Sequence, residues 1–342
     1  MQMKQLGKTE LQVSEIGFGA IPIIRLEQQQ ATAVLRHALE RGINFFDTAN
    51  AYRDSEEKIG RALKGERDKI VIASKSLLRD AKGVREHLER SLQMLGTDYI
   101  DLYQLHQIAQ EKDWQAVSAP GGALEEIIRA RDAGKIRYLG VTSHSLPMAI
   151  KLVRTGLFST IQFPFNFIEE GAALELIPLA EQLGMGFIAM KPFGGGAIDN
   201  AAVAFKFLRQ YPTCIPIPGF ESTAQVDEVV DFYAAPNQVE AADLDLMEDY
   251  RQELGKRFCR RCEYCLPCPN GVLITPAMGY KIVVNRMSPA VAVDFCQGPM
   301  ESVANCNACG ICIDRCPYDL QIPEIIKGHQ QLYLEHCRAA GR

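Results

Sequence analysis

The chain has 342 residues, of which 47% are hydrophobic and 23% charged, and its formal net charge is −5 at pH 7. This composition is that of an ordinary globular protein, long enough for one large domain and one small one. The acidic balance argues against a nucleic-acid partner, and no apolar run approaches the length of a membrane span.

Residues 1–255 alternate short β-rich runs with amphipathic segments of helical length. The opening segment, Lys4 to Leu11, predicts a small hairpin that turns near Gly7-Lys8 and closes one end of the sheet. Eight β-rich runs follow: Ile16–Ala20, Asn44–Thr48, Ile70–Lys75, Tyr99–His106, Ile136–Ser143, Ile161–Asn166, Gly186–Lys191 and Cys214–Gly219. Segments with apolar residues at helical spacing separate them: Gln28–Arg41, Ser55–Lys64, Val84–Gly96, Ala123–Ala133, Ala172–Leu183 and Asn200–Gln210.

This alternation predicts an α/β fold, an eight-stranded parallel (β/α)8 TIM barrel ringed by helices. A doubly wound open sheet is the runner-up, but no Gly-x-Gly-x-x-Gly turn follows the first strand. Three consecutive apolar strands end in the ionisable residues Asp47, Lys75 and His106, and Tyr52 follows the second strand. The C-terminal ends of barrel strands converge on one face, so we expect these four side chains to meet there. Taken singly, each also fits a structural role, as a rim aromatic, an ion pair or an inner-barrel histidine.

Eight of the eleven cysteines form two runs near the C-terminus, each ending in Cys-Pro. The second run has the spacing with which bacterial ferredoxins hold a cubane cluster, and the first is one residue shorter before its Cys-Pro. Zinc also suits Cys-x2-Cys pairs but needs two cysteines per run, and the polar segment Met1–Ser14 predicts no signal peptide and hence no disulfides. The runs therefore predict two [4Fe-4S] clusters in a small, mainly α-helical ferredoxin-like domain. Their metal ligands are Cys259, Cys262, Cys265, Cys268, Cys306, Cys309, Cys312 and Cys316.

The other three cysteines are expected to be buried or incidental thiols: Cys214 in a strand, Cys337 in a terminal helix, and Cys296 as a weak spare ligand. Residues 256–342 hold 10 Lys and Arg against 7 Asp and Glu. This basic excess is expected to offset cluster charge, with a docking patch for an acidic electron carrier as the alternative. We place the domain boundary between residues 255 and 256.

The motif Gly42-Ile43-Asn44-Phe45-Phe46-Asp47-Thr48-Ala49, followed by Tyr52, resembles the first signature of the aldo-keto reductases. Ser74-Lys75 and Leu105-His106 resemble that family's other catalytic positions, and the resemblance covers residues 3 to 235. The tail resembles the two-cluster ferredoxin modules fused to one branch of these enzymes. This implies a cytoplasmic NAD(P)H-dependent oxidoreductase acting on an aldehyde, ketone or alcohol. Tyr52 would be the acid, assisted by the Lys75 cation; Asp47 would orient that lysine and His106 the carbonyl oxygen.

The resemblance also implies the nicotinamide site, for NADP or NAD. The corresponding positions are Ser143, His144 (usually Asn), Gln162, Met190, Lys191, Pro192, Phe193, Gly194, Gly219, Gln225 and Glu228. Many relatives carry Lys and Arg where this chain has Gly219 and Gln225, and Glu221 adds a negative charge. We therefore expect a weaker preference for NADP than is usual in the family, or the use of both nucleotides. By the ferredoxin crossover, Cys259, Cys262, Cys265 and Cys316 would hold one cluster, and Cys268, Cys306, Cys309 and Cys312 the other.

Three interpretations remain open at this point. In the first, a carbonyl reductase exchanges electrons through its clusters with a ferredoxin or another electron carrier. In the second, the clusters only stabilise the fold of the tail or sense redox conditions, since a tail of this size has little hydrophobic core of its own. In the third, the chain is an electron-transfer or redox-sensing protein built on an idle barrel. The loop Gln107–Pro120 is expected to shape the substrate pocket, with Trp114 facing the substrate or packing on the surface.

Overall fold

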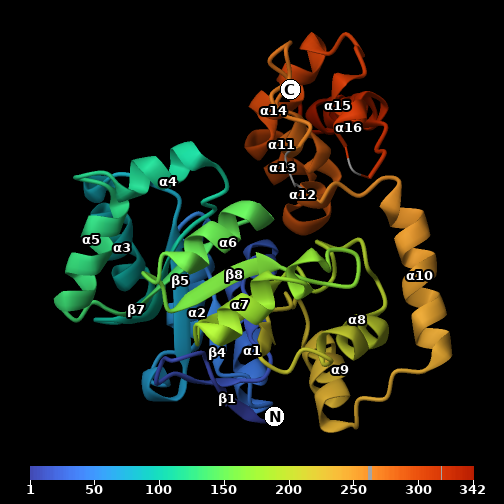
Figure 1. Ribbon diagram of the computed structural model, residues 1–342. Coiled ribbons are helices and arrows are strands. Elements are labelled where there is room, and N and C mark those ends of the chain that lie inside the picture. The colour runs from blue at the N-terminus through green and yellow to red at the C-terminus, as the bar shows by residue number, and fades with distance from the viewer. Residues whose placement is uncertain (261–263, 317) are drawn as a thin grey trace. The chain divides into compact units, whose positions relative to one another are not determined.

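The computed structural model describes residues 1–260, 264–316 and 318–342 (Figure 1). They form two compact units, one of residues 1–193 and 200–239 and the other of residues 194–199 and 240–342. Helix α10 (Ala241–Gly255) thus belongs to the second unit, together with the short segment that follows the strand β9. The assignment of residues 1–255 and 256–342 to separate domains stays a prediction.

A parallel sheet of eight strands, in the order β10-β9-β8-β7-β6-β5-β4-β3, forms the centre of the first unit. The strands are β3 (Phe18–Gly19), β4 (Phe45–Asp47), β5 (Val71–Ser76), β6 (Ile100–Leu105), β7 (Ile136–Thr142), β8 (Thr160–Pro164), β9 (Gly186–Met190) and β10 (Cys214–Pro216). The sheet curls until its edges meet: Gly19 bridges Gly219, and the Gly17 amide donates to the Pro216 carbonyl at 2.8 Å. The predicted barrel is confirmed, and the open doubly wound sheet is excluded.

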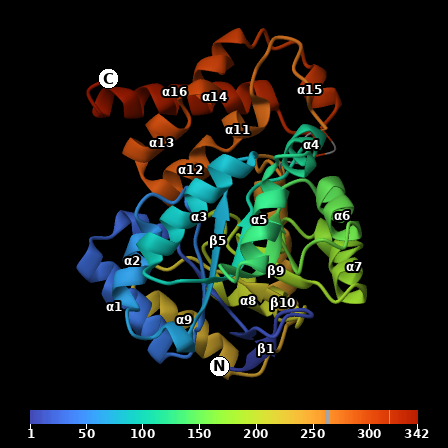
Figure 2. The ribbon, with the colours of Figure 1, turned by 90° about the vertical axis from the view of Figure 1, so that its left-hand side faces the viewer.

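Nine α-helices accompany the strands of this unit and lie outside them (Figures 1 and 2). They are α1 (Gln28–Glu40), α2 (Ser55–Ala62), α3 (Ala81–Leu95), α4 (Glu111–Ser118), α5 (Ala123–Asp132), α6 (Leu146–Arg154), α7 (Leu176–Gln182), α8 (Ala201–Leu208) and α9 (Thr223–Ala234). Short 3-10 turns form at η1 (Pro22–Arg25), η2 (Arg67–Lys69) and η3 (Gly171–Ala173). Local chemistry sets the helix ends. In α3, the Asp80 carboxylate accepts from the Gly83 amide at 2.8 Å, and left-handed Gly96 ends the helix.

Helix α4 lies inside the segment that we expected to be a loop after the fourth barrel strand. A capping box starts it, with the side chains of Gln110 and Asp113 each accepting a backbone amide of the other. Trp114 is partly buried on this helix and packs edge-on against Phe158, with ring centroids 6.4 Å apart. This contact gives Trp114 the packing role that the sequence left as one of two possibilities.

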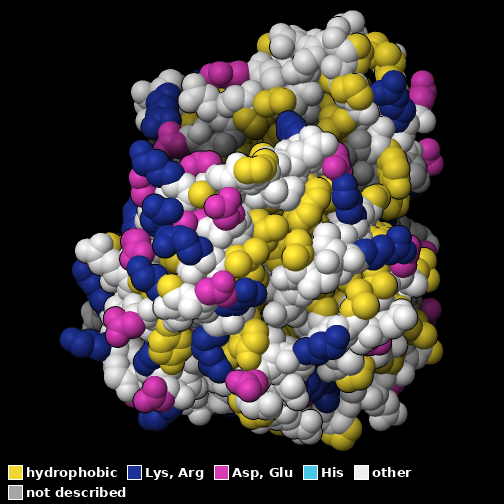
Figure 3. All heavy atoms as spheres, turned by 60° about the vertical axis from the view of Figure 1, so that its left-hand side comes forward, with side chains coloured by type: hydrophobic (Ala, Val, Ile, Leu, Met, Phe, Trp, Pro, Cys, Tyr) yellow, Lys and Arg dark blue, Asp and Glu magenta, His cyan; other side chains and the backbone are white. Residues whose placement is uncertain are grey.

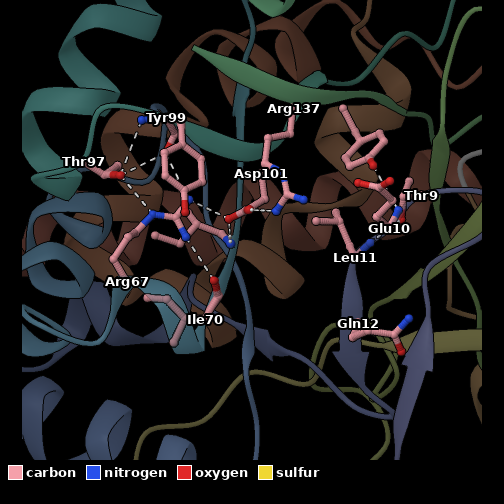
Figure 4. A network of polar contacts seen from close by, with 12 residues as sticks. Thr9, Glu10, Leu11, Gln12, Arg67, Ile70, Thr97, Tyr99, Asp101 and Arg137 are labelled. Atoms are coloured by element: carbon pink, nitrogen blue, oxygen red, sulfur yellow. Dashed lines mark hydrogen bonds and ion pairs between the residues drawn. The ribbon is translucent and has the colours of Figure 1, made fainter. Parts of the chain in front are cut away.

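The amino-terminal hairpin, β1 (Met3–Gln5) with β2 (Gln12–Ser14), covers one end of the barrel as predicted. Its buried Leu6, Leu11 and Val13 share a core with strand residues such as Phe45. A polar network ties the nearby strand starts together (Figure 4). The buried Asp101 carboxylate accepts from Arg67 at 2.7 Å and from Arg137 at 2.9 Å. Both arginines bind the one buried carboxylate, which neutralises its charge within the fold, so we assign this network a structural role.

The second unit is helical in the part that the structure describes, as predicted for the tail. Its elements are α10, α11 (Ile274–Met278), α12 (Tyr280–Met287), α13 (Pro289–Phe295), α14 (Gln297–Ser302), η4 (Val303–Asn305), α15 (Ile311–Asp314) and α16 (Ile322–Ala339). Its core joins apolar side chains to cysteines, Cys265, Cys296 and Cys316 being buried in it. A core so small, interleaved with thiols, is typical of domains that need a metal group to fold.

None of the helices in the described part of the chain combines the length and apolar character required to cross a bilayer. On the face drawn in Figure 3, Lys and Arg side chains alternate with Asp and Glu rather than gathering into a field of one sign.

Candidate functional site

The candidate active site begins with a buried ion pair between neighbouring strands. Asp47 ends β4, and Lys75 lies near the end of β5; both side chains are almost fully buried. The Lys75 ammonium donates to Asp47 Oδ1 and to the Thr48 carbonyl oxygen, each at 2.7 Å. These contacts fix the direction of the Lys75 side chain inside the barrel.

Burial raises the pKa of Asp47, and the Lys75 cation and two glutamine amides oppose that rise. The amides belong to Gln162 and Gln104, whose Nε2 atoms lie 3.4 Å from Oδ1 and 3.2 Å from Oδ2 of Asp47. Unpaired, a carboxylate in this position would take up a proton, since desolvation penalises its charged form. The charge of Asp47 therefore depends on these three donors.

Tyr52 lies in the turn between β4 and α2 and is held by backbone hydrogen bonds to Ala49 and Ser55, each at 2.9 Å. Its ring lies 5.2 Å from the Lys75 ammonium nitrogen and packs edge-on against His106, with ring centroids 5.8 Å apart. The structure thus brings together all four residues that the sequence singled out at the strand ends.

His106 follows β6 and faces the other three. Burial, then the Lys75 and Arg79 cations, hold the pKa of its imidazole well below the usual range, so the ring is neutral at pH 7. Its buried Nδ1 has no hydrogen-bond partner within the described residues. Burying an unprotonated nitrogen without a partner costs less free energy than burying an N–H donor. The tautomer with the proton on Nε2 is therefore favoured. That tautomer can donate to a carbonyl oxygen.

Two side chains that the sequence did not single out support the tetrad. Arg79 fixes the backbone beyond β6, as its terminal nitrogens donate to the carbonyl oxygens of His106 and Gln107, each at 2.8 Å. Gln104 pairs in register with Lys75 and points into the barrel. Its one signal in the sequence is that it lies two residues before His106, on the same face of the strand.

The residues expected to bind the nicotinamide ring are engaged with the chain itself. Ser143 is buried and both donates to and accepts from the backbone of Ser145. Gln162 is buried; its amide nitrogen donates to Asp47 Oδ1 at 3.4 Å, and its Oε1 accepts from Gln104 at 3.0 Å. His144 is partly buried in the turn that precedes α6. These positions lie at the ends of β7 and β8, next to the tetrad's strands.

The segment after β9 has an unusual backbone. Four residues here have positive φ, between 57° and 93°: Lys191, Gly194, Gly195 and Gly196. Glycine adopts such angles without strain, whereas the lysine does not. The Lys191 carbonyl accepts from Asn166 at 3.0 Å, Pro192 follows it, and Phe193 packs edge-on against Phe205. Met190, which ends β9, packs against the barrel core. Consecutive amides in such a loop can form an anion-binding concavity.

The segment after β10 carries an acidic side chain, Glu221, whereas phosphate groups are usually bound by basic ones. Glu221 forms an ion pair with Arg25 of η1, and its backbone amide donates to the Gln225 side chain at 2.8 Å. A Cβ on Gly219 would lie 2.4 Å from Pro22, so only glycine fits there. Glu228 is exposed on α9. Both Glu221 and Gln225 therefore interact with the chain itself.

The predicted cysteines of one cluster share a cavity. Cys268, Cys306, Cys309 and Cys312 line it, together with apolar residues of α16 and the segment 272–274, and so does Cys265, which we predicted to hold the other cluster. Of the other predicted set, Cys265 and Cys316 are buried and Cys259 is partly buried, whereas Cys262 lies outside the described residues. Across residues 1–260, 264–316 and 318–342, no three His, Cys, Asp or Glu side chains converge on a single metal ion.

Comparison with known proteins agrees with this geometry. The model of the Aldo/keto reductase family matches residues 15–204, and that of a 4Fe-4S dicluster domain matches residues 258–321. The uncharacterized oxidoreductase YrpG of Bacillus subtilis is 30% identical over 233 residues, covering 59% of this chain and 70% of its own length. The aldo-keto reductase YhdN of the same species is 33% identical over 201 residues, or 53% and 59% of the two chains. L-galactose dehydrogenase of Arabidopsis thaliana is 30% identical over 219 residues, or 58% and 68%.

Solved structures show the same fold. The holo form of the aldo-keto reductase AKR11C1 from Bacillus halodurans superposes with a TM-score of 0.64 at 24% identity, covering 73% of this chain and 96% of its own. A putative aldo-keto reductase from Pseudomonas aeruginosa gives 0.61 at 25% identity, covering 68% and 94%. The chain therefore belongs to the aldo/keto reductase family of oxidoreductases and carries a 4Fe-4S dicluster domain after its barrel.

Proposed function

We propose that this oxidoreductase reduces an aldehyde or ketone to an alcohol with NADH or NADPH, or catalyses the reverse reaction. The observation that carries the proposal is the meeting of Tyr52, Lys75 and His106 around one point at the strand ends, with Asp47 behind Lys75. A bound reduced nicotinamide supplies a hydride to the carbonyl carbon. The chain must then stabilise negative charge on the oxygen and deliver a proton to it.

The four side chains are suited to that task. Neutral His106 donates from Nε2 to the carbonyl oxygen and so orients it, while the Tyr52 hydroxyl donates the proton. The Lys75 cation near the Tyr52 ring stabilises the negative charge left on that residue. Asp47 keeps Lys75 charged and aimed. Because Lys75 is buried, this charge acts in a medium of low dielectric constant, where its effect is large.

The residues of the nucleotide site fit NAD better than NADP. Gly194, Gly195 and Gly196 leave room for a pyrophosphate to approach their backbone. The ribose end is different, because Arg25 already pairs with Glu221, whose carboxylate would repel a 2′-phosphate. We therefore infer use of NADH, or of both nucleotides, rather than strict dependence on NADPH.

The thiols fit two [4Fe-4S] clusters, which exchange single electrons when bound. Five cysteines of the described chain line one cavity, and four of them, Cys268, Cys306, Cys309 and Cys312, would supply the complete ligand set of one cluster. Cys259, Cys262, Cys265 and Cys316 would hold the other. We infer a small carbonyl or alcohol substrate, a ferredoxin or similar carrier as electron partner, and a cytoplasmic location, where thiols stay reduced.

Replacement of Tyr52 by phenylalanine tests the proposal. The variant keeps the ring and its contacts with His106 but loses the proton donor, so reduction of a panel of aldehydes and ketones should fall at least ~100-fold. Nicotinamide binding, followed by quenching of protein fluorescence, should stay unchanged. Turnover near the wild-type rate in Y52F would refute the proposed role of the site.

A further inference from the structure

One buried polar side chain inside the barrel has no role in the reaction described so far. Gln104, near the end of β6, is 0% exposed. Its amide nitrogen donates to Asp47 Oδ2 at 3.2 Å and to Gln162 Oε1 at 3.0 Å, and Gln162 in turn reaches Asp47 Oδ1 at 3.4 Å. Gln104 thus supplies a hydrogen bond to the carboxylate oxygen that does not accept from Lys75.

This arrangement costs stability. The Oε1 atom of Gln104 is buried and has no hydrogen-bond partner in the described part of the chain, so this amide oxygen has lost its water without gaining a donor. Turning the amide over would not help, because its oxygen would then face the Asp47 carboxylate. The interiors of such barrels are normally filled by branched apolar side chains, and Leu102 occupies the preceding inward position of the same strand. A leucine at position 104 would avoid the penalty.

The neighbouring strand makes room for this glutamine. Gly140 of β7 pairs with Gln104, and a Cβ at that position would lie 2.9 Å from Gln104 Cγ and 2.4 Å from Thr160 Oγ1. Because Gly140 has no side chain, the long side chain of Gln104 has room to extend to Asp47. Thr160, 0% exposed, also has an unpartnered hydroxyl but no contact with Asp47 that the structure records, which makes it a natural control.

We infer that Gln104 is a positioning residue of the reaction: it holds the Asp47 carboxylate in its charged form and in the orientation that aims Lys75 at Tyr52. The inference rests on the proposed function. The other charged or titratable groups that face the Asp47–Lys75 pair are Tyr52, Glu56 of α2, His106, and Arg79 behind it. Gln104 and Gln162 are the two neutral side-chain donors that the described residues offer to Asp47.

The test compares Gln104→Met and Gln104→Glu with the control Thr160→Val in the cluster-loaded protein. Met has similar length and no hydrogen bonds, so kcat should fall about 10- to 100-fold while the NADH dissociation constant stays within about twofold. Glu can donate to Asp47 only while it shares a proton with it, so Q104E should be active at low pH and lose activity as the pH rises. T160V should keep the wild-type rate and pH profile, because the lost hydroxyl donates no hydrogen bond to Asp47.

A second readout does not depend on turnover. The Asp47 carboxyl carbon, labelled with 13C and assigned by comparison with Asp47→Asn, should titrate at a higher pH in Q104M than in the wild type. An unchanged titration, or a Q104E profile parallel to the wild type, overturns the inference even if the enzyme is active. A loss of NADH affinity with unchanged kcat also overturns it, because Gln104 would then serve Gln162 and the nucleotide. Failure of the proposed function is distinct: wild type and Y52F would then reduce every carbonyl equally poorly, while the carbon titration still reports on Gln104.

Discussion

Arg79 holds His106 by its backbone rather than by its ring. The guanidinium donates to the carbonyl oxygens of His106 and Gln107, each at 2.8 Å, and approaches Asp113 of α4 at 3.6 Å. Gln107 has a left-handed backbone, with φ of 57°, which strains a non-glycine residue. One side chain from the loop after β5 thus stabilises the turn that presents His106 to the substrate.

Replacing Arg79 by methionine should therefore impair the reaction through His106. Two charge-assisted hydrogen bonds disappear, and each is worth about 1.5–3 kcal/mol at most. We expect kcat/KM for a carbonyl substrate to fall ~10-fold or more, with the NADH dissociation constant unchanged. Steady-state kinetics and a fluorescence titration separate the two effects. Arg131→Met is the matched control, because exposed Arg131 pairs only with the adjacent Asp132 among the contacts the structure records. Equal kinetics for R79M and R131M would contradict the assignment.

The neutral imidazole of His106 links stability to pH. Its pKa lies well below the usual range in the folded protein, whereas in the unfolded chain a histidine titrates near about 6.5. Below that pH the unfolded state binds a proton that the folded state does not, so this contribution is present above about pH 6.5 and lost as the pH falls. The loss amounts to at most about 1.4 kcal/mol per pH unit. His106→Gln should reduce the drop in melting temperature between about pH 7.5 and pH 5.5, measured anaerobically at matched iron content. An equal drop in both proteins would show that His106 is accessible to protons.

Much of the fold and of the site followed from local patterns in the sequence. Alternating apolar runs and helical segments predicted the barrel, because burial on both sheet faces leaves a continuous apolar signature at each strand. Strand ends carrying Asp47, Lys75 and His106 predicted the site, because parallel strands bring those ends to one face.

What the sequence did not show depends on contacts between distant segments. Gln104 looks like an ordinary strand residue until register pairs it with Lys75 and Gly140. In the sequence, Arg79 is one loop arginine among others. Its role is visible only in the structure, where the backbone turn at Gln107 directs the Gln107 carbonyl oxygen toward the guanidinium. The sequence predicts a loop where helix α4 forms, because the helix begins after Gln110 rather than after Ser, Thr, Asp or Asn, the residues that usually precede a helix.

The ion pair between Arg25 and Glu221 gives a test of nucleotide choice. Glu221→Gln removes a negative charge from the expected ribose site, next to the Arg25 cation, which attracts a 2′-phosphate. We expect NADPH to bind about tenfold more tightly, with NADH affinity changed less than about twofold, since only NADPH carries the added dianion. The double variant with Arg25→Met should lose that gain. A gain that persists without Arg25, or no gain in E221Q, would place the 2′-phosphate elsewhere.

The shared cavity of Cys268, Cys306, Cys309 and Cys312 predicts which substitutions remove the same cluster. Cys268 belongs to the first run in sequence, and with Cys265 it lines the cavity that holds three cysteines of the second run. By the predicted crossover, Cys268→Ser and Cys312→Ser should leave the same residual EPR spectrum after dithionite reduction. Each should lower the iron content from about eight to about four atoms per chain, the content of one cubane. Cys296→Ser is the control: burial raises the pKa of that thiol to about 11, and it lies in the apolar core, so iron content should not change. If C268S instead shared its residual spectrum with C265S, the clusters would follow the sequence runs, without the crossover. The same spectra recorded after adding NADH, with Y52F for comparison, would show whether electrons pass between the nicotinamide and the clusters.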